Sequence, residues 1–282
     1  MSAVVLPALD ERVRWSVRVV DARSGSVLAD HTSDLVCETA SVGKVFLLIE
    51  VASRLDDGTL TPDQLVEIPD EHRVADSGLL YLMRTQRLPV ADLALLAGAV
   101  SDNLATNALI SLCGLDRVRA VAPTLGYTHT TLLDYIRNER LEGMPWTPSY
   151  GTGAELCDLM RRLGARQIVS PAVSAQVLDW LGADTDTSMV ASALLLDPLA
   201  HLDPEYQGMV LRHKTGTTSV TRVDTGHLAG PAGAVAYAVC ANWRGSSDDD
   251  LRAPVLAAMA DIGESLRQYV TGLQRESAVV AA

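Results

Sequence analysis

The chain has 282 residues, of which 48% are hydrophobic, and its 35 acidic and 23 basic side chains give a formal net charge of −12. The hydrophobic content excludes a disordered chain, and the acidic balance argues against non-specific binding to nucleic-acid phosphates. Aromatic residues make up only 4% of the sequence, so we expect a core built mostly from leucine, valine and alanine. The sequence has no uninterrupted apolar run of about 20 residues, so we expect no membrane span.

The predicted elements begin with a β-hairpin over residues 15–30, where apolar and polar residues alternate on both sides of a short turn. Residues 40–55 start with small residues and continue as an apolar run, which predicts a helix. Residues 88–180 are rich in helical patterns. An irregular loop with two prolines and three glycines interrupts them at residues 134–153, and long loops of this kind often serve function.

Strand patterns return from residue 208, and the alternating small and β-branched residues at 233–243 suit a central antiparallel strand. A last helix is predicted over residues 252–272. Strands at both ends of the chain with helices between them predict an α/β (α+β) fold. In this fold an antiparallel sheet of N- and C-terminal strands carries flanking helices and an inserted all-helical lobe.

We expect one domain over residues 1–282 with two lobes. One lobe is formed by residues 1–55 together with 206–282, and the other by residues 56–205. A cleft between two lobes is the expected place for a functional site.

Metal sites and disulfides find little support in the sequence. The cysteines lack C-x-x-C spacing, and the histidines lack paired ligand spacing. No glycine-rich phosphate loop follows a predicted strand. We therefore expect no metal and no cofactor. Ordinary buried thiols are expected at Cys37, Cys113, Cys157 and Cys240. Surface or turn positions are expected for His31, His72, His129, His201, His213 and His227, although His213 could also line the site.

The first residues do not read as a secretory signal. Pro7 interrupts the apolar run, and Asp10 and Glu11 follow soon after it. This start predicts a cytoplasmic protein with no membrane partner, or a secreted one if a leader has been removed.

The first chemical motif is Ser41-Val42-Gly43-Lys44, at the start of the predicted helix of residues 40–55. A serine and a lysine three residues apart share one helix face, so the amine can reach the hydroxyl. Serine needs a neighbouring base to become a nucleophile, and a lysine becomes that base when burial lowers its pKa. The motif alone is common. Here, however, Lys44 lies within an apolar run, which favours a buried functional amine over a solvated one.

Two further motifs follow in order. Ser101-Asp102-Asn103 lies between two helical stretches, where it could act simply as a helix cap. Lys214-Thr215-Gly216-Thr217 lies in a strand-like segment, where the glycine could mark a bulge or let a ligand approach the backbone. Each motif has an ordinary structural explanation. The three together, in this order, are much more specific.

With these motifs the whole chain resembles the class A β-lactamase-like serine hydrolases, also called penicillin-recognising enzymes. The segments 76–80 and 101–107 look like that family as well. The resemblance implies an acyl-enzyme on Ser41, activation by Lys44 and proton transfer to the leaving nitrogen by Ser101. It implies that substrate is held by Asn103, by Lys214 with Thr215 and Gly216, and by the backbone N–H of Thr217, which forms an oxyanion hole with the N–H of Ser41. Arg222 lies near the position in the sequence where the family often has a carboxylate-binding arginine; an ordinary surface arginine is the alternative.

One departure from the family concerns the loop glutamate that activates the deacylating water. The family motif Glu-x-x-Leu-Asn is absent here, and the nearest candidates are Glu139 and then Glu142. With a placed glutamate, the resemblance implies β-lactam hydrolysis. Without one, it leaves a cytoplasmic esterase or amidase, or a penicillin-binding protein-like acyltransferase or peptidase. A non-catalytic binding module is the remaining alternative. The expected partner is a small molecule with an amide, lactam or ester and a carboxylate.

Overall fold

The computed structural model describes residues 4–68, 70–85, 87–199, 208–245 and 250–273. His201 therefore lies outside the described residues. The main sheet has five antiparallel strands in the order β2-β1-β10-β9-β8. Its strands are β1 (Arg14–Asp21), β2 (Val27–His31), β8 (Val210–Thr218), β9 (Thr221–Gly230) and β10 (Gly233–Asn242). The N-terminal hairpin thus joins three C-terminal strands, as the sequence predicts.

Two small sheets and a set of helices complete the fold. The small sheets contain β3 (Val36–Glu38), β6 (Thr131–Leu132) and β7 (Ser149–Thr152), and β4 (Leu65–Glu67) with β5 (Arg87–Pro89). The α-helices are α1 (Lys44–Asp56), α2 (Val90–Ala99), α3 (Asn103–Cys113), α4 (Leu115–Thr124), α5 (Gly153–Gly164), α6 (Pro171–Leu181) and α7 (Arg252–Thr271). Short 3-10 turns are η1 (Ala40–Gly43), η2 (Asp70–His72), η3 (Leu80–Leu82) and η4 (Val190–Leu194).

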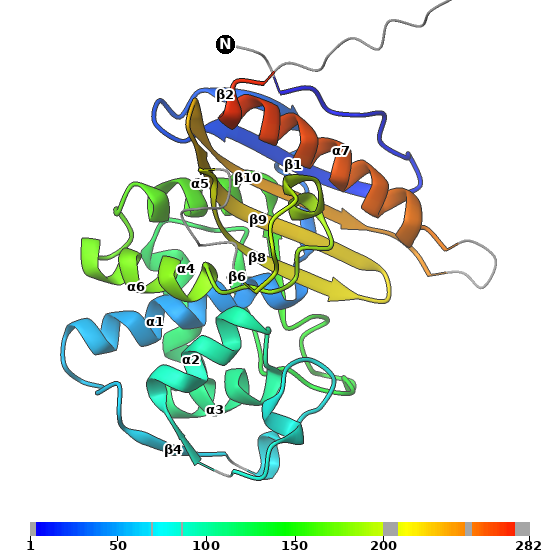
Figure 1. Cartoon of the computed structure of the whole chain (residues 1–282). Coiled ribbons are helices and arrows are strands. Elements are labelled where there is room, and N and C mark those ends of the chain that lie inside the picture. The colour runs from blue at the N-terminus through cyan, green and yellow to red at the C-terminus, as the bar shows by residue number, and fades with distance from the viewer. Residues whose placement is uncertain (1–3, 69, 86, 200–207, 246–249, 274–282) are drawn as a thin grey trace, which may run out of the picture.

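The sheet is covered on both faces (Figure 1). Helix α7 and the turn η4 pack over one face, around buried side chains such as Tyr237, Val239 and Ile262. Helix α5 packs over the other face against β10, β1 and β9, and α1 and α6 lie beyond the edge strand β8, with α2 and α3 farther out. The central strand β10 is buried along nearly its whole length, which explains its small and β-branched residues.

The fold class predicted from the sequence is confirmed: an antiparallel sheet of N- and C-terminal strands carries flanking helices. The residues predicted as a helix at 40–55 form η1 followed by α1, in which Lys44 and seven apolar residues are buried. All four cysteines are buried free thiols, as predicted.

His213 corrects one prediction. It is neither a surface nor a turn residue, because its side chain is completely buried in β8. Its Nδ1 lies 3.1 Å from Asp224 Oδ1, which also accepts a hydrogen bond of 2.9 Å from the Tyr237 hydroxyl. Successive strand residues point to opposite faces, so this cluster lies on the α7 face and Lys214 points the other way.

Candidate active site

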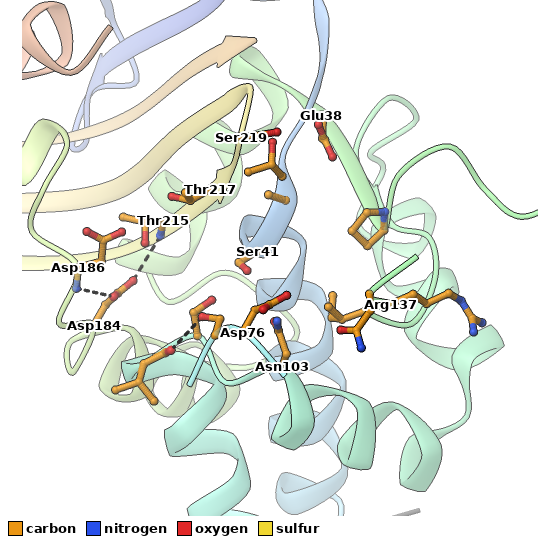
Figure 2. Close-up of a pocket in the computed structure, with 18 of the residues that line it drawn as sticks. Glu38, Ser41, Asp76, Asn103, Arg137, Asp184, Asp186, Thr215, Thr217 and Ser219 are labelled. Atoms are coloured by element: carbon orange, nitrogen blue, oxygen red, sulfur yellow. Dashed lines mark hydrogen bonds between the residues drawn. The ribbon is translucent and has the colours of Figure 1, made fainter. Parts of the chain in front are cut away.

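One cleft brings the three sequence motifs together. It has a volume of about 800 Å³ and is lined by Ser41 from η1, Ser101 and Asn103 from the start of α3, and Thr215 and Thr217 from the edge strand β8. The irregular loop adds Ile136 and its neighbours to one wall. Figure 2 shows Ser41 in the middle of these elements, with the β8 threonines on one side and Asn103 below.

Ser41 is held tightly by the segment before it. Ala40 has a positive φ of 47°, and its carbonyl accepts a hydrogen bond of 2.5 Å from Ser149 Oγ. On the other side, β8 runs directly against this segment. A side chain at Gly216 would lie 2.2 Å from the Thr39 carbonyl and 3.2 Å from the Ser41 amide. Only glycine permits this approach, which brings strand β8 against the backbone at Ser41.

Lys44 lies one turn after Ser41, with its amine fully enclosed. The Nζ atom donates hydrogen bonds to the Ser101 carbonyl at 2.6 Å, to Ser101 Oγ at 3.1 Å and to Asn103 Oδ1 at 2.8 Å. Burial, followed by the nearby charge of Lys214, lowers the pKa of Lys44 well below its ordinary value. The arrangement gives a buried amine in direct contact with a cleft hydroxyl.

Asp102 fixes the Ser101–Asn103 segment. Its Oδ1 caps α3 by accepting from the Ala105 amide, and its Oδ2 accepts from the amides of Leu79 and Leu80, both at 2.7 Å. Gly78 lies against this carboxylate with a φ of +102°, and a Cβ atom there would lie 2.3 Å from it. The loop of residues 76–80 is therefore tied to the start of α3.

The wall formed by the irregular loop is fixed by a buried asparagine. Asn107 donates to the carbonyls of His72 and Ile136, at 2.9 and 2.8 Å, and its Oδ1 accepts from the Ile136 amide at 2.9 Å. Farther along, Arg137 and Arg140 both bind the buried carboxylate of Asp134. The Asn107 contacts hold Ile136 at the wall of the cleft.

Lys214 is also buried, and it forms an ion pair of 3.0 Å with Asp184. The same carboxylate accepts from the Thr215 amide at 3.3 Å and, through its other oxygen, from the Asp186 amide at 3.0 Å. Burial works to raise the pKa of Asp186, but hydrogen bonds from Ser188 and Thr215 outweigh it and lower the value. Both carboxylates line the cleft beside β8 (Figure 2).

The model of the beta-lactamase enzyme family matches residues 3–270 of the chain. The chain belongs to this family. It is a serine hydrolase of the β-lactamase type.

Solved structures of the family are similar over most of their length. A β-lactamase from Sphaerobacter thermophilus DSM 20745 is 24% identical, with a TM-score of 0.79 and 93% of each chain covered. A mutant of the class A β-lactamase of the last common ancestor of Gram-negative bacteria is 25% identical, with a TM-score of 0.73, covering 90% of this chain and 92% of that one. PBP-A is 19% identical, with a TM-score of 0.75 and coverages of 92% and 90%. No curated protein matches the chain.

Most of the residues that the family resemblance singled out lie at one place in this β-lactamase fold. Those that line the cleft directly are Ser41, Ser101, Asn103, Thr215 and Thr217. Lys44 and Lys214 lie beneath its floor, and Gly216 supports it from β8. Asn103 is also tied to Lys44, whose Nζ donates to its Oδ1.

Glu139 is not brought to the cleft. Its side chain is exposed and lines a neighbouring shallow pocket with His72 and Arg73, and Glu142 is exposed as well. The contacts of Asn107 explain why: they turn Ile136 toward the cleft, three residues before Glu139. The loop residues that line the cleft are Ile136, Arg137, Asn138, Arg140 and Pro148, so the loop places no glutamate there.

Arg222 is also directed elsewhere. Its guanidinium donates to the carbonyls of Thr218 and Thr221, at 2.6 and 2.7 Å, and lies 5.9 Å above the Trp243 ring. It fastens the turn between β8 and β9, so the surface alternative describes it better than the carboxylate-binding one.

Sequence reasoning missed Asp184, Asp186, Ile136 and the role of Asn107. A polar stretch, Asp184-Thr185-Asp186, directly after the apolar helix α6 was the available signal for the two aspartates. Within the part of the chain that the structure describes, no group of histidine, cysteine or acidic side chains could hold a metal ion. None of the described helices is long and apolar enough to cross a membrane.

Proposed function

We propose that Ser41 and Lys44 carry the acylation step. Neutral Lys44 accepts the Ser41 proton while Ser41 Oγ attacks the lactam carbonyl carbon. The oxyanion then receives hydrogen bonds from the amides of Ser41 and Thr217. Ser101 relays the proton from Lys44 to the lactam nitrogen as the C–N bond breaks. The observation that carries this assignment is the buried amine of Lys44, bonded to Ser101 Oγ and Asn103 Oδ1.

Deacylation is assigned to the same dyad. In this proposal Lys44 takes a proton from the attacking water and returns one to Ser41 Oγ as the acyl ester breaks. Support comes from the exposed position of Glu139 outside the cleft and the apolar Ile136 at its wall. A dedicated loop base typically contributes a factor of about 10²–10⁴, so we expect deacylation to be slower than acylation.

The test is turnover of a chromogenic cephalosporin together with labelling by a fluorescent penicillin. The wild-type protein should hydrolyse the cephalosporin and accumulate a penicillin adduct on Ser41. Ser41→Ala should lose both, whereas Glu139→Gln should keep both. Activity that survives in Ser41→Ala would overturn the assignment of the nucleophile, and a loss in Glu139→Gln would restore the loop base.

We also propose that the chain acts as one catalytic domain with the two lobes stated above. The position of α2 and α3 beyond α1, away from the sheet, supports a helical lobe. Helix α5 and the turn η4 belong to residues 56–205 but contact the sheet and α7. The lobes would thus share an extensive interface, and limited proteolysis should not separate them.

A further inference from the structure

A second pocket lies outside the active site, in a groove between α1 and α4, and has a volume of about 250 Å³. Ile49 of α1, Val121 of α4, and Leu125 and Val169 beyond these helices make the walls of this α1–α4 groove mainly apolar. None of its described lining residues also lines the cleft around Ser41. An apolar cavity of about 150 Å³ already holds benzene, so the groove has room for one ring with a short side arm.

The carboxyl group of Glu50 forms part of the α1–α4 groove. Its Oε1 atom is enclosed by protein, and no group in the described part of the chain donates a hydrogen bond to it. Arg54, one turn along α1, is directed instead to the Leu112 carbonyl at 3.4 Å and the Thr59 hydroxyl at 3.3 Å. Arg117 is exposed at the groove; its charge and that of Arg54 lower the pKa of Glu50, but burial outweighs them and the pKa lies above its ordinary value. A buried acceptor without a donor is costly, so this oxygen favours a donor supplied by a ligand.

The two hydroxyl groups of the α1–α4 groove can only accept hydrogen bonds from a ligand. Ser53 Oγ donates its proton to the Ile49 carbonyl, and Thr124 Oγ1 donates to the Ala120 carbonyl, both at 2.7 Å. Each hydroxyl has a single hydrogen, so only its lone pairs remain available. Apart from Arg117, the described polar side chains that line the groove therefore present acceptors.

Val169 lines the same groove in a strained backbone conformation. Its φ is +57°, which is rare for a β-branched residue, and its apolar side chain is 61% exposed. Neighbouring contacts hold it there. Ser174 Oγ accepts from the Ile168 amide and donates to the Ile168 carbonyl, and Ser170 Oγ donates to Asp56 at the end of α1 at 2.8 Å. Such strain is concentrated at functional positions, including ligand clamps, and an apolar ligand in the groove would cover this valine.

We propose that the α1–α4 groove binds a small primary amine, with its apolar part between the two helices and its ammonium group beside Glu50. An ammonium group has three donors and no acceptor, which complements the Glu50 carboxylate and the hydroxyl oxygens of Ser53 and Thr124. Its contact with the carboxylate is direct and partly enclosed, whereas Arg117 is exposed and its repulsion is screened by solvent. The site is independent of the reaction at Ser41.

The experiment uses three probes of similar shape: 2-phenylethylamine, 2-phenylethanol and 3-phenylpropionate. Isothermal titration calorimetry gives their affinities for the full chain, and methyl-labelled NMR spectra locate them through the signals of Val121 and Leu125. We expect the amine to bind at least about tenfold more tightly than the alcohol, because it forms a charge-assisted hydrogen bond with Glu50. The carboxylate should not bind in the groove.

Two variants of the groove test these contacts. Glu50→Gln removes a carboxylate whose ionised form is disfavoured by burial, so it should fold. It should weaken amine binding at least about tenfold and change the affinity of the alcohol by less than about threefold. Ala120→Phe, at an exposed position of α4, fills the groove and should weaken both probes while Glu50 stays in place. Asp76→Asn removes a carboxylate that lines the active-site cleft, and as the matched control it should keep the wild-type affinity.

Four results would overturn the site: an alcohol that binds as tightly as the amine, an amine affinity that Glu50→Gln leaves unchanged, a loss of amine binding in Asp76→Asn, or no shift of the Val121 and Leu125 methyl signals. The third result would place the amine in the active-site cleft instead of the α1–α4 groove.

Discussion

Lys44 makes the rate of acylation dependent on pH. Its pKa lies well below the ordinary lysine value because of burial and the charge of Lys214, and only the neutral amine can accept the Ser41 proton. The acylation rate should therefore rise with pH through this lowered pKa and level off well before pH 10.5. Stopped-flow measurement of the acylation rate with a chromogenic cephalosporin, at a series of pH values up to 10.5, checks this prediction.

A control variant tests whether Lys44 is the group responsible for this pH dependence. Lys44→Arg keeps a positive charge that cannot be removed in the accessible pH range, so it should lose at least 10³-fold in acylation rate at every pH. A variant with near wild-type activity and the same pH profile would show that another group accepts the proton.

Ile136 offers a gain-of-function test. Because Asn107 fixes its backbone at the wall of the cleft, Ile136→Glu should bring a carboxylate toward the acyl-enzyme. We expect deacylation to speed up by at least tenfold with acylation little changed, as measured by single-turnover kinetics. Leu141→Glu, at an exposed position of the same loop, is the matched control and should have no such effect. An unchanged deacylation rate in Ile136→Glu would show that water is not positioned there.

At this scale, the residues that the sequence identified best are those whose role depends on local spacing. Ser41 and Lys44 share a helical turn, so their proximity follows from the sequence alone. The roles of Glu139 and Arg222 depend instead on the direction that their loop or strand gives to each side chain. Contacts with Asn107, about 30 residues away, and with the carbonyls of the β8–β9 turn decide their directions. No local pattern encodes such contacts.

The loop of residues 76–80 is an element whose shape depends on one glycine. Gly78→Ala combines an unfavourable φ of +102° with a contact of 2.3 Å to Asp102. We expect it to lower the free energy of unfolding by more than about 3 kcal/mol and to reduce acylation, because the Asn103 amide bonds to Ser77. Denaturant unfolding and nitrocefin-type turnover measure the two effects.

Gly58 supplies the control for this prediction. It also has a positive φ, of +76°, but no heavy atom lies within 4 Å of its hypothetical Cβ. Gly58→Ala should cost only about 1–2 kcal/mol, the backbone penalty alone, and leave activity intact. Equal costs at the two positions would mean that the close contact with Asp102 is relieved easily.

The elements themselves were largely predictable, because most of them carry a local hydrophobic pattern that matches their burial. The hairpin at 15–30, the helix at 40–55 and the central strand at 233–243 each show such a pattern, and the structure contains all three. Buried polar clusters were not predictable. His213 lies in the core with its Nδ1 beside the carboxylate of Asp224 on the neighbouring strand β9, and the Tyr237 hydroxyl on β10 donates to the same carboxylate oxygen.

The buried cluster of His213, Asp224 and Tyr237 makes the stability of the whole molecule depend on pH. Burial works to lower the pKa of His213, but the charge and hydrogen bond of Asp224 outweigh it, so the pKa lies above its ordinary value of 6.5. A group with a raised pKa in the folded state stabilises fully below its unfolded pKa and loses that contribution as pH rises. The free energy of unfolding should therefore contain a term that falls between pH 6.5 and the raised pKa.

Denaturant unfolding at a series of pH values isolates this term. The free energy of unfolding of the wild-type protein minus that of His213→Asn should fall with rising pH. The same difference for His31→Asn should not change with pH, because His31 is exposed. A flat difference for His213→Asn would mean that the buried ring keeps one protonation state throughout.

The positive φ angles at Ala40 and Ser101 have a consequence for how the enzyme could evolve. Both residues are non-glycine and adjoin or form the catalytic segments, and such backbone costs about 1–3 kcal/mol at each position. The packing of the folded protein offsets this backbone cost before any substrate binds, so the cleft has its reactive shape in the free enzyme. We expect substitutions that relax this backbone, such as Ala40→Gly, to raise thermal stability and to lower the acylation rate, so selection for heat resistance alone would work against catalysis at these positions.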